Sequence, residues 1–373
     1  MRAISVLTLG LSVGAAPLFT RQGDGYPAPE TVGPTPKDEW VQTYQSARSA
    51  GKIPAFAPAQ LSGTSGLYYT ISGCFGDTDI FQAPNGSYGV SCDDGPLPTS
   101  PPLYSFLQQQ NQTATHFLIG SNILNNPGIF RQVLETGGHL AVHTWSHPQM
   151  TTLSDTAILG ELGWTIQIIH DYSGGYIPKY WRPPYGDADN RVRAIAEEVF
   201  GLTLVAWDQD SDDWCLTPSG GTSCGGEGPS SFSDLISVES WQNGNKSPGV
   251  LGLQHELSTY TVQGFIQTFA NIARQGWTAG CIPDLFGEPW YLNALRDETA
   301  DSTVQIGAGP HTLAKPDPSP ATTSTADASS TPSSSEEASQ GTLSASTPSG
   351  AGSNEVSNVV AIFAILLAST VFV

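Results

Sequence analysis

The sequence has few basic residues: 14 lysines and arginines stand against 34 aspartates and glutamates, for a formal net charge of −20. This balance argues against nucleic acid and anionic membrane surfaces as partners, whereas a neutral or cationic polymer would be tolerated. The chain also lacks a His-Glu-x-x-His sequence, the helix motif of one class of zinc peptidases, so we do not expect a peptidase of that class.

The chain also lacks apolar runs long enough to span a membrane. The apolar stretches at its two ends are shorter than the ~20 residues that a membrane-spanning helix needs. At the N-terminus, Arg2 precedes an apolar stretch over residues 4–13 and the small residues Gly14, Ala15 and Ala16. This order is typical of a secretory signal peptide, which we assign to residues 1–15.

The C-terminus carries an uncharged apolar tail over residues 359–373, preceded by a polar spacer and a cluster of small residues. This pattern predicts a GPI-anchor signal over residues 349–373, whose tail is removed, and a protein held at the outer surface of the plasma membrane and in the cell wall. A tail-anchored helix is the alternative, which the shortness of the tail disfavours. The candidate attachment residues are Ser349, Gly350, Gly352 and Ser353.

Composition divides the remaining chain into three parts. Residues 16–62 are rich in Pro, Ala and Gly and predict a poorly ordered lead-in, whereas residues 300–348 have the Ser/Thr/Pro-rich composition of an O-glycosylated stalk. Residues 63–299 are long enough for one folded catalytic domain. Sequons for N-glycosylation, which fit passage through the secretory route, occur at Asn85, Asn111 and Asn245.

Five cysteines in an oxidising compartment suggest two disulfides and one remaining thiol. Cys215 and Cys224 flank a short Gly/Ser/Thr-rich loop and would form a local bridge. Cys74 and Cys281 flank the catalytic region and could join its ends, which leaves Cys92 buried and free. The sequence alone leaves the other pairings open.

The folded domain alternates apolar strands with helical patterns, as expected of parallel strands with crossover helices. We therefore predict an α/β fold, an irregular (β/α) barrel with about six to eight units and an active site at the C-terminal ends of its strands. Strands are expected at 88–92, 115–119, 139–142, 180–181, 202–207 and 250–253. Helices are expected at 102–110, 127–136, from 154 onward, 189–200, 232–241 and 260–274.

Polar side chains follow the predicted strands at their C-terminal ends, which meet at one mouth of a barrel. His143 and His147 are four residues apart and follow one strand, and the pair Asp93-Asp94 follows another. Two histidines and one carboxylate, with one position left for water, are the ligands of a hydrolytic zinc-type centre. The other aspartate is then free to act as a base. Taken singly, the histidines could be buried structural residues and the Asp-Asp-Gly-Pro segment a surface turn.

Three further segments contain candidate catalytic groups. Arg182, in a loop stiffened by proline, could orient a catalytic carboxylate, and the backbone N–H of Tyr185 could donate to an oxyanion. His255, after the last predicted strand, is a candidate general acid, with Asp210 raising its pKa and fixing its tautomer. Side chains that could wall a small apolar pocket are Trp214 and Leu253.

These motifs, read in order, resemble those of the polysaccharide deacetylase family, carbohydrate esterase family 4. The motifs are Asp-Asp-Gly-Pro, His-Thr-x-x-His, Arg-x-Pro-Tyr, Asp-x-x-Asp-Trp and Leu-x-Leu-x-His, spread over residues 67–290. The longer matches His-Thr-Trp-Ser-His-Pro and Arg-Pro-Pro-Tyr-Gly-Asp are similar to fungal chitin deacetylases. Two departures stand out: Cys92 replaces a usual aromatic residue, and Glu256 replaces the aspartate that often follows the last histidine.

The resemblance implies metal-dependent removal of N-acetyl groups from chitin, with Zn or Co as the cofactor. It implies Asp93 as the base, Asp94, His143 and His147 as metal ligands, and Arg182 as the residue that orients the base. It also implies that Asp210 tunes His255 as the acid, and that Leu253 and Trp214 wall the acetyl pocket. Two alternatives are an inactive, surface-tethered chitin-binding wall protein and a deacetylase of another acetylated glycan such as xylan.

Overall fold

The computed structural model describes residues 25–59, 76–216, 223–224, 229–231, 233–235, 239–296, 298–311 and 313. The expected signal peptide, residues 312 and 314–348 of the expected stalk, the anchor signal and Cys74 lie outside these residues. Within the described part of the chain, no helix is both long and apolar enough to cross a membrane.

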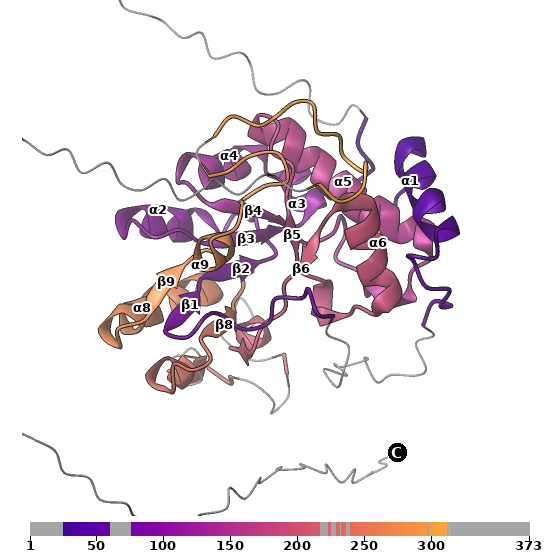
Figure 1. The fold of residues 1–373 in the computed structure, drawn as a ribbon. Coiled ribbons are helices and arrows are strands. Elements are labelled where there is room, and N and C mark those ends of the chain that lie inside the picture. The colour runs from indigo at the N-terminus through magenta and orange to yellow at the C-terminus, as the bar shows by residue number, and fades with distance from the viewer. Residues whose placement is uncertain are drawn as a thin grey trace, which may run out of the picture. The chain divides into compact units, whose positions relative to one another are not determined.

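The strands form two parallel sheets at the centre of the fold (Figure 1). One sheet has the order β2-β3-β4-β5-β6, and the other has the order β7-β8-β1-β9. An isolated parallel bridge between Asp93 and His255 links the first sheet to the second. The strands are β1 (Ser87–Gly89), β2 (Ser91–Asp93), β3 (Thr115–Leu118), β4 (His139–Val142), β5 (Tyr180–Trp181), β6 (Thr203–Leu204), β7 (Gln209–Asp210), β8 (Val250–Leu253) and β9 (Thr278–Gly280).

The predicted α/β class with parallel strands is confirmed, and the barrel is irregular because two sheets share its wall. The strand expected at 88–92 is in fact two strands. Its first half pairs with β8 and β9, and its second half pairs with β3, so the chain passes from one sheet to the other at Val90. This crossover brings the ends of β2 and β8 together.

Helices cover the strands on the outside, and three of them are capped at their N-termini by polar side chains. Ser154 and Asp189 accept hydrogen bonds from backbone N–H groups of the first turns of α5 and α6, and Ser258 forms a capping box at α8. The helices are α2 (Pro101–Gln109), α3 (Gly120–Asn125), α4 (Pro127–Glu135), α5 (Asp155–Ser173), α6 (Asn190–Phe200), α8 (Thr259–Arg274) and α9 (Ile282–Phe286). Of the helix expected at 232–241, part lies outside the described residues, and its end is a short 3₁₀ helix, Glu239–Asn243.

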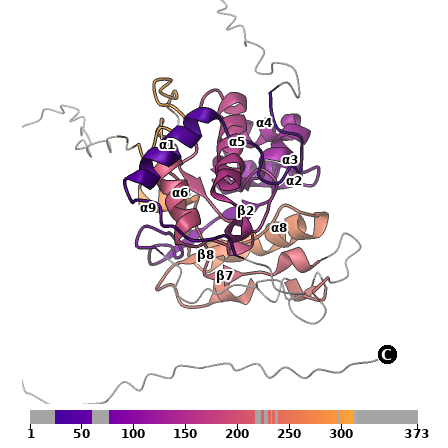
Figure 2. The ribbon, with the colours of Figure 1, turned by 90° about the vertical axis from the view of Figure 1, so that its right-hand side faces the viewer.

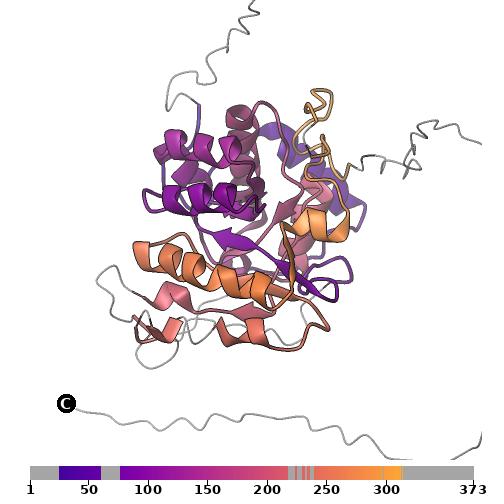
Figure 3. The ribbon, with the colours of Figure 1, turned by 90° about the vertical axis from the view of Figure 1, so that its left-hand side faces the viewer.

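The expectation of a poorly ordered lead-in over residues 16–62 is wrong for residues 25–59. This segment contains helix α1 (Asp38–Ser49), which lies across α6 and α5 in Figure 2, on the side of the sheets opposite to α8 (Figure 3). Trp40 is only 1% exposed and packs edge-on against Trp164 and Phe200. These few aromatic contacts hold the helix on the domain. The helix was not predicted because the surrounding sequence is rich in Pro and Ala, a composition that indicated disorder.

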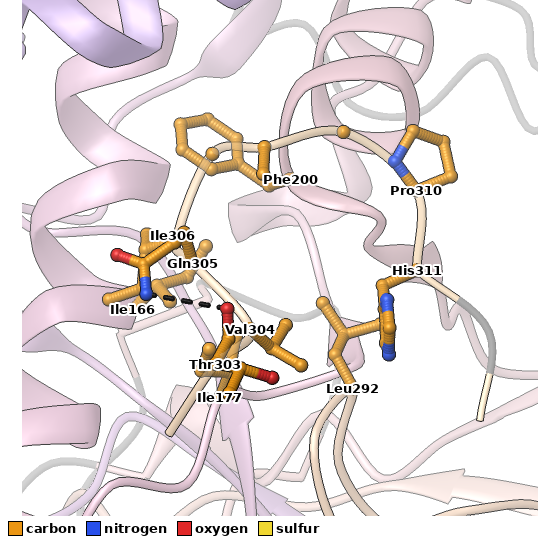
Figure 4. A pocket seen from close by; sticks show the side chains of 13 residues that line it. Ile166, Ile177, Phe200, Leu292, Thr303, Val304, Gln305, Ile306, Pro310 and His311 are labelled. Atoms are coloured by element: carbon orange, nitrogen blue, oxygen red, sulfur yellow. Dashed lines mark hydrogen bonds between the residues drawn. The ribbon is translucent and has the colours of Figure 1, made fainter. Parts of the chain in front are cut away.

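The predicted domain boundary at residue 299 is also wrong, because residues 300–311 continue to pack on the domain. The N–H of Gly309 donates to the carbonyl of Val199 over 3.0 Å, and Thr43 Oγ1 donates to the carbonyl of Gly307 over 2.6 Å. Together with residues of α5 and α6, this segment lines an open pocket of about 210 Å³ (Figure 4). None of the predicted catalytic side chains lines this pocket.

Candidate metal centre and active site

Three predicted metal ligands come together where β2 and β4 end. Asp94 Oδ1 lies 3.4 Å from His143 Nε2 and 3.4 Å from His147 Nε2, and all three atoms lie within 4.8 Å of one another. Asp94 directly follows β2, His143 directly follows β4, and His147 lies in the turn beyond. The spacing of the three atoms suits one shared cation.

The turns that carry these ligands have unusual backbone conformations. Asp94, Thr144 and His147 have φ angles of 74°, 67° and 60°, in the left-handed region that residues other than glycine seldom adopt. Thr144 Oγ1 accepts the N–H of His147 over 3.0 Å and closes the second turn. Such conformations persist only where the surroundings enforce them, which is typical of functional sites.

The ligand atoms fit a divalent metal on two independent grounds. Asp94 Oδ1 is buried and has no hydrogen-bond partner, a costly arrangement that a cation would relieve. His143 Nδ1 lies 2.7 Å from the carbonyl oxygen of Arg182, and since a carbonyl can only accept, Nδ1 carries the proton and Nε2 presents its lone pair to the site.

The charge states also suit metal binding. Burial lowers the pKa of His147 to about 4, so its imidazole is neutral at pH 7. Burial alone would raise the pKa of Asp94, but the neighbouring imidazoles of His147 and His143 outweigh it and hold that pKa well below its usual range. At neutral pH the site therefore offers a neutral imidazole at His147 and an ionised carboxylate at Asp94.

Asp93, the other aspartate of the pair, is held by Arg182. Arg182 Nη1 donates to Asp93 Oδ1 over 2.7 Å, and both side chains are almost completely buried. The guanidinium also donates to the carbonyls of Val205 and Ala206 and lies 4.1 Å from the ring centroid of Phe117. This fixes the Asp93 carboxylate with Oδ2 3.8 Å from His143 Nε2, beside the ligand cluster.

His255 is paired with Asp213, and the prediction that Asp210 tunes it is wrong. His255 Nδ1 lies 2.5 Å from Asp213 Oδ1, and the His255 N–H donates to Asp213 Oδ2 over 2.9 Å. Burial would lower the pKa of His255, but the charge and hydrogen bond of Asp213 outweigh it and raise the pKa to about 10. His255 is therefore protonated at neutral pH.

Asp210 has a different set of partners. Its Oδ1 accepts the N–H of Asp212, its Oδ2 accepts Trp207 Nε1, and burial raises its pKa to about 6. Asp212 has a φ angle of 49°, and this left-handed turn directs the following Asp213 back to His255. The motif contains several aspartates, and the turn that selects among them could not be read from the sequence.

The other predicted site residues lie at different depths. Tyr185 is 51% exposed, has a φ angle of 57°, and stacks edge-on against His147 with ring centroids 4.7 Å apart. Trp214 is 38% exposed, whereas Leu253 is buried on β8. Tyr185 and Trp214 are thus accessible beside the residues of the centre, while Leu253 belongs to its wall.

A buried polar network behind Asp93 and His255 was not predicted. The Glu256 carboxylate lies 2.6 Å from His116 Nδ1 and accepts the hydroxyl of Tyr104 over 2.6 Å. The N–H of Glu256 donates to the carbonyl of Asp93 over 3.0 Å, so this residue joins the two strand ends. Its position directly after His255 was the only available signal.

The structure tests one of the two predicted disulfides and the exposure of the predicted glycosylation sites. The Cys215–Cys224 disulfide is confirmed, and it closes the loop that follows Asp213. The predicted pairing of Cys281 with Cys74 falls on a residue outside the described part of the chain; among the described cysteines, Cys281 and Cys92 are buried and make no disulfide. Residues with exposed side chains include the three sequon positions, Asn85, Asn111 and Asn245.

Residues 81–205 match the profile of the polysaccharide deacetylase family. The chain is 42% identical over 270 residues to chitin deacetylase 3 of Cryptococcus neoformans, a match that covers 70% of this chain and 63% of the relative. It is 42% identical over 184 residues to a chitin deacetylase of Amylomyces rouxii, covering 48% of this chain and 42% of the relative. The solved chitin deacetylase of Colletotrichum lindemuthianum superimposes with a TM-score of 0.49 and 22% identity, covering 57% of this chain and 95% of that one.

Proposed function

This chain contains a polysaccharide deacetylase domain, and from that premise we propose that it hydrolyses N-acetyl groups of N-acetylglucosamine units in chitin. The products would be acetate and a chitosan-like polymer with free amines. The single observation that carries this proposal is the placement of the Asp94–His143–His147 cluster beside the Arg182–Asp93 pair.

Asp94, His143 and His147 would hold a divalent metal, for which we propose zinc or cobalt. Such an ion supplies a Lewis acid that polarises an amide carbonyl and lowers the pKa of a water molecule. Catalytic zinc sites typically use three protein ligands and keep a further position for water, and this set of three would fit that pattern.

Asp93 is assigned as the general base. Arg182 occupies Asp93 Oδ1, so Oδ2 is the oxygen that would take the proton of the water that attacks the acetyl carbonyl. The buried guanidinium restricts the carboxylate to one orientation, which keeps Oδ2 directed at the ligand cluster. Orientation of this kind contributes to catalysis by holding the reacting groups in place.

His255 is assigned as the general acid. It would donate its Nε2 proton to the leaving amine as the carbon–nitrogen bond breaks, and Asp213 on Nδ1 keeps the ring oriented and protonated. The Tyr185 N–H would donate to the oxyanion formed on the acetyl oxygen. Leu253 and Trp214 would wall the acetyl methyl group.

The polymer and the location are argued from separate observations. The similar fungal proteins are named chitin deacetylases, and exposed aromatic rings at Tyr185 and Trp214 suit stacking on sugar rings. The Cys215–Cys224 disulfide and three exposed sequon asparagines support a secreted protein, tethered by the GPI signal expected at residues 349–373.

A substrate panel tests the proposed polymer. Acetate release would be compared on N-acetylglucosamine oligomers and on acetylated xylan, with the zinc-loaded protein and with Asp93→Asn as the blank. We expect release from the chitin oligomers only. Release from xylan alone would move the assignment to another glycan, and binding to chitin without any release would favour the wall-binding alternative.

A further inference from the structure

A buried carboxylate on α5 lies directly beneath the turn that carries two metal ligands. Glu161 has no exposed surface, and both of its oxygens accept hydrogen bonds from this turn. Oε2 accepts the N–H groups of Trp145 and Ser146 over 2.8 and 2.9 Å, and Oε1 accepts Ser146 Oγ over 2.7 Å. Both N–H donors lie in the three-residue segment between His143 and His147, so the carboxylate binds the segment that sets the distance between the ligands.

The same carboxylate binds a second segment, the N-terminal arm, which we define as residues 25–36. The N–H of Gly33 donates to Glu161 Oε1 over 2.7 Å. The ring of Tyr26 stacks nearly parallel on Trp145, with centroids 6.3 Å apart, and Trp145 Nε1 donates to the carbonyl of Ala28 over 3.2 Å. We call residues 143–147 the ligand turn. The arm contacts this turn through Trp145 and through the carboxylate of Glu161, which binds both segments.

Close packing fixes the arm on α5. A Cβ atom on Gly160 would lie 1.7 Å from the carbonyl oxygen of Pro34, and one on Gly33 would lie 2.5 Å from Ala157 Cβ. Trp164 Nε1 also donates to the carbonyl of Thr35 over 2.8 Å. The arm has no room to shift without moving away from Glu161.

We propose that Glu161 is a positioning residue of the metal centre and that the N-terminal arm acts through it to hold the ligand turn in its metal-binding geometry. Thr144 and His147 have left-handed backbone conformations, which make this turn unfavourable by itself. The Glu161 carboxylate compensates by accepting hydrogen bonds from the backbone N–H groups of the turn. The inference rests on the proposed metal centre. It makes a segment outside the matched family region part of that centre.

Zinc affinity, measured on the whole chain by competition with a chromophoric chelator at pH 7, tests the role of Glu161. In Glu161→Gln one oxygen acceptor is replaced by an amide that faces N–H donors, so we expect the dissociation constant to rise about 10-fold or more, as for other residues that support metal ligands. The matched control is Asp79→Asn, which breaks a buried ion pair with Arg193 away from the turn. It should lower the melting temperature and leave the zinc affinity unchanged.

The role of the arm is tested separately, which also covers a Glu161 variant that does not fold. Gly33→Ala should displace the arm through its clash with Ala157 and weaken zinc binding several-fold. Gly51→Ala is its control, because Gly51 also has a positive φ angle but faces open space. In the double variant Glu161→Gln/Gly33→Ala, the two effects should be less than multiplicative, since both act through one carboxylate.

The outcomes separate the two proposals. Zinc affinities of Glu161→Gln and Gly33→Ala within twofold of the wild type would overturn the positioning role while leaving the metal centre intact. Fully multiplicative effects in the double variant would overturn the claim that the arm acts through Glu161. A wild-type chain that binds no zinc would overturn the metal centre itself, and the positioning role with it.

Discussion

At the scale of single residues, the two candidate acid–base groups owe their character to one partner each. Arg182 occupies one oxygen of Asp93 and leaves the other beside the proposed metal ligands. Asp213 holds the imidazole of His255 through Nδ1 and leaves Nε2 for the reaction. Both partners are buried, so these interactions are weakly screened by water and salt.

Replacing Asp93 by Asn should separate catalysis from metal binding. The variant keeps the shape of the side chain but cannot take a proton, so we expect turnover to fall about 10²-fold or more. Zinc affinity should stay close to that of the wild type, because Asp94 and the two histidines are unchanged. Acetate release and zinc titration on the same sample check this, and near-normal turnover would remove Asp93 from the role of base.

Asp213→Asn and Asp210→Asn form a matched pair that tests which aspartate supports the acid. Asp213 contributes the largest effects that raise the pKa of His255 to about 10. Without its charge we expect this pKa to fall, so that a larger share of the rings is neutral at pH 8. The alkaline limb of the pH–activity profile of Asp213→Asn should therefore shift to lower pH, with activity at pH 8 reduced about 10²-fold. Asp210→Asn should keep the alkaline limb of the wild-type pH profile; the reverse pattern would restore the role predicted for Asp210.

Metal retention should depend on pH through His147. Because burial lowers its pKa to about 4, the ligand is neutral above that value and is protonated, and unable to bind metal, below it. Protonation of His147 should therefore weaken zinc binding only as the pH approaches 4. Equilibrium dialysis at a series of pH values measures this, and loss of zinc near pH 6.5 would indicate an ordinary, solvated histidine.

At the scale of elements, the sequence predicted best where apolar periodicity and caps coincide. Strands β3, β4, β5 and β8 and helices α2, α4, α6 and α8 lie close to their predicted ranges. Helix α1 was missed because its burial depends on tertiary aromatic contacts, and the short strands β7 and β9 because they contain too few residues for a periodic pattern. The proposed metal ligands were predicted from their spacing and motif order, whereas the choice of Asp213 over Asp210 depends on one left-handed turn.

Trp40→Ala tests whether α1 is an integral part of the domain. The side chain is 1% exposed and its removal would leave a large cavity between α1, α5 and α6, so we expect the free energy of unfolding to fall by about 3–5 kcal/mol. Urea denaturation measures this change. The exposed Phe56 provides a control of the same aromatic class, and Phe56→Ala should change stability by well under 1 kcal/mol.

At the scale of the whole molecule, the chain combines a strongly acidic composition with a cluster of side chains that could hold a cation. The two sheets meet at β2 and β8, and this junction places the base at the end of one strand and the acid after the other. The N-terminal arm and residues 300–311 wrap the same domain, so its folded extent is larger than the region matched to the family. Activity should therefore depend on one ion bound in one domain.

The most direct test of this account is acetate release from an N-acetylglucosamine oligomer as zinc is added back to the chelated protein. We predict that release is absent without metal, rises in proportion to added zinc, and reaches its plateau at one ion per chain. Release that persists at full rate after complete removal of metal would contradict the metal-dependent mechanism. A folded, zinc-loaded chain that releases no acetate from any chitin oligomer would contradict the proposed substrate.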